Sequence, residues 1–432
     1  MRRHSLCALA AAGLLAGGLT TSASAADLGG NCCADLEERI SELEATTARK
    51  GNRKVSLTIS GWVAEQVMWW DDGEESNVYV GGLGTTLSSH FKLTGQATIT
   101  PGWQAGYVIQ VEANSNEPLG WNQAKDDGSG PKVDLLQSYW FVNSDRLGRV
   151  SVGQLSHASD NVAILVDGSG SLVPANWVDF DHTNFLTRTN GAYNTLAWSD
   201  FQYCQHISLG IGGDCNGVPQ NAVRYDTPAF AGFSASASWG EDDFWDVAVR
   251  YAGEFNGIKL AVATAYSHYA DERGPAGGAA DVWHRDSDYF QIGAYIQHVP
   301  TGLFLYGAYG HENNDNINKN NAVSQDNDQY YIKAGLRRKW LALGHTVMFG
   351  EYGHRNDMYR PGAEIATNVP VVGSNVKNWG LGLVQEIDAA AMSLWLVYRH
   401  SDGDFDALNG ATRVSGDLED FDLVKFGALI NF

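Results

Sequence analysis

The stretch from residue 421 to residue 432 constrains the fold more than any other part of the chain. Every second position from Val424 to Phe432 is apolar, and the positions between them include Lys425 and Asn431. Strict alternation of this kind predicts a strand with one apolar and one polar face. An aromatic residue at the end of such a strand is typical of a transmembrane barrel, in which the last strand closes the sheet and ends at the membrane interface.

The first 25 residues have the pattern of a signal peptide. Arg2 and Arg3 precede an apolar run over residues 6–19, and Ala23, Ser24 and Ala25 form a small-residue cleavage site. The run is too short to span a bilayer as a helix, and no later window approaches the ~18 apolar residues that a transmembrane helix needs. We therefore expect an exported mature chain that is periplasmic, secreted or an outer-membrane barrel.

Composition favours the barrel. The chain has 49 Gly, 14 Trp and 18 Tyr, which suits closely packed strands with aromatic girdles at the two membrane interfaces. The formal net charge is −21, and it becomes −23 once Arg2 and Arg3 are removed. Nucleic-acid binding requires a basic face, so this charge argues against a nucleic-acid partner.

Two cysteines are expected to form a disulfide. Cys204 and Cys215 close a short loop in a chain that we expect to enter an oxidising compartment. Cys32 and Cys33 are adjacent, and we expect either bridges between protomers or plain thiols there.

A single convincing helix is predicted over residues 35–50. Leu36, Ile40 and Leu43 have the spacing of a short coiled-coil seam, flanked by charged residues. An isolated helix of this length is marginal in water, so a three-stranded bundle beneath a trimeric barrel is predicted. The alternative is a frayed amphipathic tail. The predicted organisation is a signal peptide (1–25), a periplasmic segment with this helix (26–54) and a transmembrane β-barrel (55–432).

From residue 55 onward the hydrophobic period changes to two, and sixteen antiparallel strands are predicted. Short Gly/Pro turns alternate with mostly longer polar loops, as in bacterial outer-membrane barrels. The long loops include residues 157–220, 312–328 and 401–420. The expected strands cover residues 55–70, 90–99, 103–113, 134–143, 149–155, 221–228, 233–239, 245–252, 258–269, 288–299, 303–311, 329–338, 345–354, 376–386, 392–400 and 421–432.

With these features the mature chain resembles the general porin family of alphaproteobacteria. The resemblance rests on residues 35–61, where the heptad segment continues into the first strand, on residues 221–226 and on the aromatic end. It implies a sixteen-stranded trimeric barrel for passive passage of small hydrophilic solutes, with the third loop (157–220) folded into the lumen. That loop is long, and residues 192–199 and 207–212 could form one further hairpin, which would give eighteen strands as in sugar-specific porins.

Selectivity is predicted to depend on charges on opposite sides of the lumen. The third loop is rich in acids, and lumen-facing bases are expected on the wall across from it. Such a transverse field would orient ions and dipolar solutes, and the acidic balance of the loop predicts a mild cation preference. The expected acids are Asp160, Asp167, Asp179 and Asp181, and the expected bases are Arg224, Arg250, Lys333, Arg337 and Arg399.

No catalytic constellation stands out. The chain has neither His-Glu-x-x-His nor Gly-x-Ser-x-Gly, and no cofactor is expected. Divalent cations at the external loop 312–328 are an alternative to plain solvation there. The competing hypotheses are a sugar-selective channel with Trp121, Trp177 and Trp198 as stacking platforms, an outer-membrane hydrolase and a structural outer-membrane protein. Expected partners are two further copies of the chain, outer-membrane lipid, lipopolysaccharide and the permeating solutes and ions.

Overall fold

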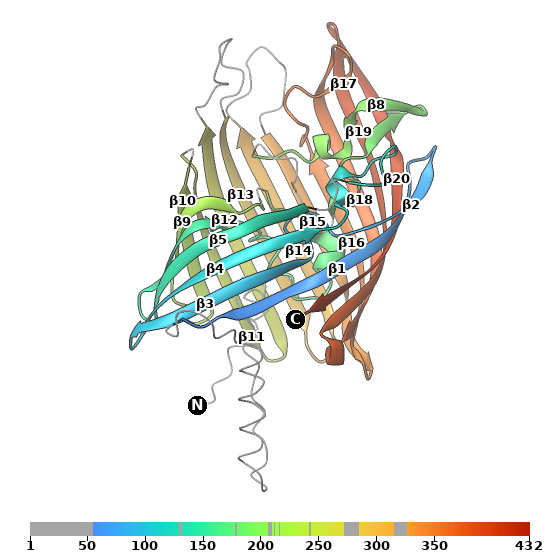
Figure 1. Cartoon of the computed structure of the whole chain (residues 1–432). Helices are drawn as coiled ribbons and strands as arrows, with labels where there is room; N and C mark the ends of the chain where they lie inside the picture. Colours follow the sequence, from blue (N-terminus) through green and yellow to red (C-terminus); the bar gives the residue numbers. More distant parts are fainter. Residues whose placement is uncertain are drawn as a thin grey trace.

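The computed structural model describes residues 55–128, 132–177, 179–205, 210, 212–215, 217–241, 243–271, 285–314 and 326–432 (Figure 1). The predicted signal peptide and the helix with Leu36, Ile40 and Leu43 lie outside the described residues, as do Cys32, Cys33 and most of the loop 312–328. None of the helices in the described part of the chain is long and apolar enough to cross a membrane.

One antiparallel sheet closes on itself as a barrel, because β1 pairs with β20 through residues 62–71 and 431–422. The prediction of sixteen wall strands is confirmed. The wall strands are β1 (Thr58–Asp71), β3 (His90–Thr100), β4 (Trp103–Asn114), β5 (Lys132–Ser144), β6 (Gly148–Leu155), β9 (Gln220–Asp226), β10 (Phe233–Gly240), β11 (Trp245–Phe255), β12 (Ile258–Asp271), β13 (Arg285–His298), β14 (Leu303–Asn314), β15 (Asp326–Leu341), β16 (Gly344–Asn356), β18 (Val369–Ile387), β19 (Met392–Asn409) and β20 (Thr412–Asn431).

Two short strands extend the wall. β2 (Ser76–Gly81) pairs with the upper part of β1, and β17 (Glu364–Ala366) pairs with β18. The proposed extra hairpin in the third loop is not part of the wall. β7 (Leu186–Thr189) and β8 (Ala192–Ala197) pair with each other in a separate two-stranded sheet. The second strand expected for the extra hairpin covered residues 207–212, and of these, residues 207–209 and 211 lie outside the described residues.

The alternation of side chains is confirmed in the strand that first suggested the barrel. Phe426, Ile430 and Phe432 point outward with 53%, 44% and 59% of their surface exposed, whereas Lys425 is buried on the inner face. A half-apolar strand of this kind is stable only if the outer face meets lipid and the inner face meets polar groups or water.

The connection between the last two strands differs from the sequence prediction. Residues 401–420 were expected to form a long loop, but β19 and β20 remain paired up to Asn409 and Thr412. The stretch is rich in Asp, which is typical of loops, yet Phe405 and Ala407 keep the inward alternation and are buried. Above the membrane, outward carboxylates remain in water, so the strands can continue beyond the bilayer.

Short helical turns complete the fold. They are η1 (Pro118–Gly120), η2 (Val173–Trp177), η3 (Asp179–His182), η4 (Trp198–Phe201) and η5 (Asp388–Ala390). Of these, η2, η3 and η4 belong to the third loop. At the opposite end, tight turns join the strands. Gly302 in one of them has φ +78°, and a Cβ there would lie 2.1 Å from the carbonyl oxygen of Arg337.

Candidate functional site: the lumen and its third loop

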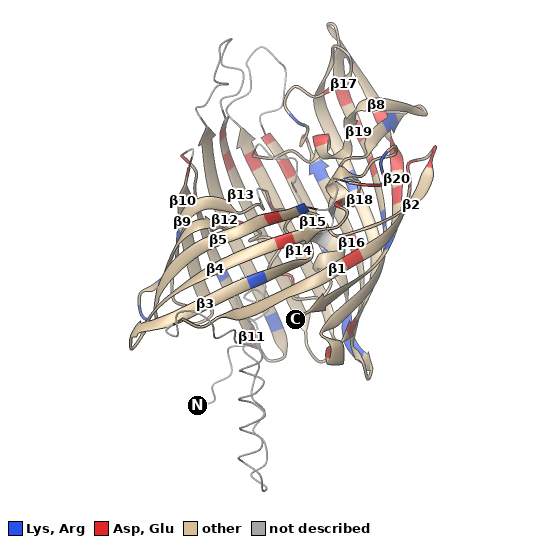
Figure 2. Cartoon of the chain, in the orientation of Figure 1, with Lys and Arg blue, Asp and Glu red and all other residues tan. Residues whose placement is uncertain are grey.

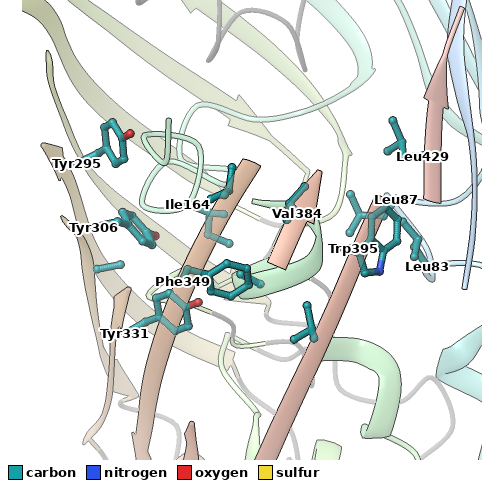
Figure 3. Packing of buried hydrophobic residues seen from close by; sticks show 14 of the residues in the cluster. Leu83, Leu87, Ile164, Tyr295, Tyr306, Tyr331, Phe349, Val384, Trp395 and Leu429 are labelled. Atoms are coloured by element: carbon teal, nitrogen blue, oxygen red, sulfur yellow. The ribbon is translucent and has the colours of Figure 1, made fainter. Parts of the chain in front are cut away.

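The first half of the third loop, residues 156–182, runs along the inside of the barrel wall. The Tyr306 hydroxyl of β14 donates a hydrogen bond to the Ala163 carbonyl at 2.8 Å. A Cβ on Gly293 would lie only 2.0 Å from that same carbonyl oxygen, so the loop can approach β13 because position 293 is Gly. Figure 3 shows Ile164 of this loop beside the aromatic side chains Tyr306 and Phe349 of the wall.

Buried ion pairs fix this half of the loop to the wall. Asp167 pairs with Lys333 of β15, and both side chains are fully buried. Asp181 accepts a hydrogen bond from Lys425 of β20 at 2.6 Å, and this pair is also fully buried. Because a buried charge is tolerated only with a partner, each pair holds a loop position against one particular strand.

Arg399 of β19 anchors the loop in a different way. Its guanidinium pairs with Glu351 of β16 at 2.9 Å and also donates a hydrogen bond to the Ala175 carbonyl. The base therefore binds a backbone oxygen of the third loop as well as a carboxylate of the wall.

The second half of the third loop returns across the long-loop end of the barrel. Arg188 on β7 pairs with Asp72 at 2.8 Å and with Glu75 at 2.7 Å. Further along, Asp200 pairs with Arg360 at 2.6 Å. These contacts tie the return segment to the loops that follow β1 and β16.

Cys204 and Cys215 form a disulfide within the return segment. Asp214, next to this bond, accepts a hydrogen bond from Gln291 of β13 at 2.9 Å. Burial, and then the negative charge of Asp160, raise the pKa of Asp214 well above its usual range. Burial likewise raises the pKa of Asp160.

A packed aromatic cluster fills the lumen between the return segment and the strands around β1 and β20. Trp121 and Trp198 belong to it and are 0% and 1% exposed. These two tryptophans are packing residues and cannot serve as stacking platforms for a solute. The side chain of Trp177 lies outside the described residues. The other large members of this extracellular aromatic cluster are Met68, Trp70, Tyr79, Phe185, Leu196, Phe201, Tyr359, Ile365, Phe405, Leu418, Phe421 and Leu423.

An open cavity of about 880 Å³ remains beside the part of the wall that the third loop does not cover. It extends from the short-turn end, at Asn143 and Gly148, to the loop at Asp160 and Asn161. Charged residues from β3, β6 and β9 line it, namely Lys92, Arg149, Arg224 and Asp226, together with Asp145 and Asp160.

Two of these bases form no ion pair within the described residues. Arg149 lies over the Phe141 ring, 3.7 Å from its centroid, and donates to the Ser151 hydroxyl at 3.1 Å. Lys92 is 9% exposed on the inner face of β3. Arg224, by contrast, pairs with Asp226 at 2.7 Å and also holds the carbonyls of residues 156 and 157.

The remaining predicted site residues lie apart from this cavity. Arg250 donates to Ser236 and to the Ala158 carbonyl, each at 2.6 Å. Arg337 pairs with Glu386 of β18 at 2.8 Å rather than with an acid of the loop. The side chain of Asp179 lies outside the described residues. Among the described residues, two of the predicted loop acids, Asp167 and Asp181, are joined directly to wall bases, whereas Asp160 lines the open cavity together with Arg224.

Sequence reasoning missed Lys92, Arg149 and Lys425 as site residues. All three occupy inward positions of their strands, so the alternation on β3, β6 and β20 could have identified them. The sequence could not show which bases lie beneath the third loop and which line the open cavity.

A closed antiparallel barrel with an apolar outer face, a charged interior and an inward-folded loop defines an outer-membrane channel protein. The family comparison agrees with this class. The model of the Gram-negative porin family matches residues 8–406, and the chain belongs to that family. Family and fold indicate a channel rather than an enzyme.

Solved structures show the same fold at low sequence identity. An anion-selective porin from Comamonas acidovorans matches with a TM-score of 0.56 and 16% identity, over 88% of this chain and 100% of that one. OprB of Pseudomonas putida matches with a TM-score of 0.52 and 11% identity, over 92% and 97%. OmpT of Vibrio cholerae gives 0.50 and 12%, over 89% and 99%. Comparison with curated protein sequences gives no significant match.

Proposed function

We propose that the chain forms a water-filled channel for passive diffusion of small hydrophilic solutes and ions. The passage is the cavity beside β3, β4, β5, β6 and β9. The observation that carries the proposal is the lining of this cavity by charged and polar groups, while apolar side chains cover the outer face of the barrel.

Ion preference is proposed to follow from the charges that face this cavity. The predicted cation preference depended on loop acids, but Asp167 and Asp181 are buried with bases that neutralise them. Lys92 and Arg149 form no ion pair among the described residues, and neither do two acids of the same lining, Asp145 and Asp160. Burial raises the pKa of Asp160, which weakens its charge relative to the two bases. Because unpaired charge in a low-dielectric passage attracts the opposite ion, the geometry favours a weak anion preference.

The reversal potential across a salt gradient in a planar bilayer tests this proposal. We expect the wild-type chain to pass chloride more readily than potassium. The K92Q/R149Q variant should lose that preference while still conducting. A cation preference in the wild type would contradict the anion proposal and would support the original prediction from sequence. A reconstituted chain with no conductance would contradict the channel itself.

A sugar-selective channel remains a prediction without a structural observation in its favour. Liposome swelling with a size series of sugars separates the two hypotheses. Uptake that falls smoothly with size supports a general channel, whereas a saturable preference for one sugar supports the selective one.

We further propose that the chain is a homotrimer that associates through the wall around β1 and β2. Glu65 points outward on β1, between Val63 and Val67, which are 53% and 41% exposed. Its Oε1 accepts a hydrogen bond from Ser115 at 3.1 Å. A carboxylate on the lipid face is unfavourable, so a second copy of the chain is the better neighbour for this surface. One solved structure of Vibrio cholerae OmpT is described as a trimer form.

A further inference from the structure

The wall beside β1 contains more residues than a regular ladder would hold. Gly81 at the end of β2 pairs with Gln66 of β1, and His90 at the start of β3 pairs with Trp62 of β1. An uninterrupted ladder would place three residues between Gly81 and His90, but the chain has eight there. Five residues are therefore in excess, and we call residues 82–89 the β2–β3 segment.

The extra residues fold into the lumen. Leu83 and Leu87 of the segment are 0% exposed and belong to a cluster of buried side chains inside the barrel. Figure 3 shows both of them beside Trp395, which lies on the inner face of β19. The same cluster contains Ala64 of β1 and Leu429 of β20, which pair with each other. The β2–β3 segment therefore covers the inner side of the seam at which the barrel closes.

Two buried carboxylates hold the backbone of this segment. The Thr85 N–H donates a hydrogen bond to Oε1 of Glu117 at 3.0 Å. The Thr86 N–H donates to Oε2 of Glu112, on β4, at 3.1 Å. Thr86 has φ +70°, a left-handed conformation that a β-branched residue keeps only where its surroundings impose it. The segment is therefore fixed in one conformation by the wall around it.

The segment also contacts the third loop. A Cβ on Gly84 would lie 3.1 Å from Cδ2 of Phe180 in that loop. The side-chain amide of Gln66 donates to the Gly82 carbonyl at 3.3 Å and also to the carboxylate of Asp181. The two elements therefore meet at β1, and together they cover the inner wall on the side of β19, β20 and β1.

The open cavity lies next to this covered side of the wall. Its lining includes Thr86 from the β2–β3 segment, and Asp160, Asn161 and Leu165 from the third loop. The side chain of Thr86 is partly exposed, whereas Leu87, which follows it, is fully buried. Figure 2 shows that charged side chains also lie along the strands that surround this space. Both elements therefore border the same passage, and Thr86 is the point at which the segment reaches it.

We propose that the β2–β3 segment is a second constricting element of the channel, and that Thr86 helps to determine which solutes pass. The inference rests on the proposed function, because it concerns the width of the same passage. The third loop narrows the lumen along β13–β20, and the segment fills the space between that loop and β3. Since the diameter and the lining of a pore decide what it admits, a change at Thr86 alters the size limit while the third loop stays as it is.

Two opposite changes to the segment test the inference in the full chain. Deletion of residues 83–87 leaves three residues between Gly81 and His90, which is the number that an uninterrupted ladder needs. We expect this variant to show a higher single-channel conductance and, in liposome swelling, to admit sugars that the wild type excludes. T86W adds a large ring at the edge of the cavity. It should lower the conductance and shift the size limit toward smaller sugars.

V63W is the matched control for T86W. Val63 is 53% exposed on the outer face of β1, so the added ring lies outside the lumen and should change neither conductance nor size limit. Far-UV circular dichroism checks that each variant is folded, and if the deletion variant does not fold, T86W decides alone. Wild-type conductance and size limit in folded T86W, or in the folded deletion variant, would overturn the inference and leave the channel proposal in place. A wild type without conductance would contradict the proposed function, and this inference with it.

Discussion

Lys425 on the last strand and Asp181 in the third loop form a fully buried ion pair, with 2.6 Å between Nζ and Oδ2. The two residues are 244 positions apart in the sequence. The pair therefore joins the strand that closes the barrel to the loop that narrows it.

Breaking this pair should release the loop. K425M leaves the Asp181 carboxylate buried without its base, which costs about 3–5 kcal/mol. We expect a lower urea midpoint and a higher, noisier single-channel conductance. The double variant K425M/D181L should recover part of the stability because no charge is left buried. K339Q breaks an exposed pair with Asp388 and should change the stability little, because water and salt screen an exposed pair. Equal effects of K425M and K339Q would contradict the role assigned to the buried pair.

Acid should stabilise the return segment of the third loop. The pKa of Asp214 is raised in the folded state by burial and by Asp160, whereas an unfolded Asp titrates near a pKa of about 3.9. The stabilising effect of its proton is therefore complete below about pH 3.9 and is lost as the pH rises through the folded-state pKa. D214N should raise the melting temperature at about pH 8 and change it little at about pH 4. A destabilised D214N at the higher pH would show that the carboxylate is ionised and needed.

Removing the disulfide should loosen the same segment. The bond closes a loop with a sequence separation of 11, and bonds of this kind contribute about 2–4 kcal/mol. C204S/C215S should show increased current noise and faster proteolysis between residues 200 and 217, while the barrel itself stays folded. A reducing agent should reproduce these effects in the wild type and have none in the variant.

Glu65 distinguishes a protomer contact from a lipid contact. If the β1 wall faces a second copy, E65L should lower the temperature at which the oligomer dissociates on a mild denaturing gel. If this wall faces lipid, the same change should stabilise the barrel, since it removes a carboxylate from an apolar environment. A matched E65Q variant separates loss of charge from loss of hydrogen bonding with Ser115.

Much of the fold could be predicted because a two-residue period is a local signal. A short window of sequence is enough to predict that Phe426 points outward and Lys425 points inward. Sixteen such windows define the wall of the barrel. The prediction of a loop around Asp402 and Asp404 was wrong, because the local composition of this segment resembles that of a loop. Only the pairing of β19 with β20 shows that the strands continue there.

The site was harder to predict because it depends on long-range pairing. The sequence shows that Asp167 and Asp181 are acids in the third loop, but not that Lys333 and Lys425 lie beneath them. The same limit applies to Lys92 and Arg149, whose importance comes from the wall that the loop leaves uncovered.

Because the third loop folds into the barrel, the width of the barrel and the width of the channel are set by different parts of the chain. Strand number fixes how wide the barrel is, yet the third loop and the extracellular aromatic cluster occupy one side of it. The proposed passage therefore lies off-centre, beside the part of the wall that the loop leaves uncovered. Substitutions in the loop can therefore change the width of the proposed channel without changing the backbone hydrogen bonds between the wall strands. Permeability can therefore differ between porins that share the same sixteen-stranded barrel.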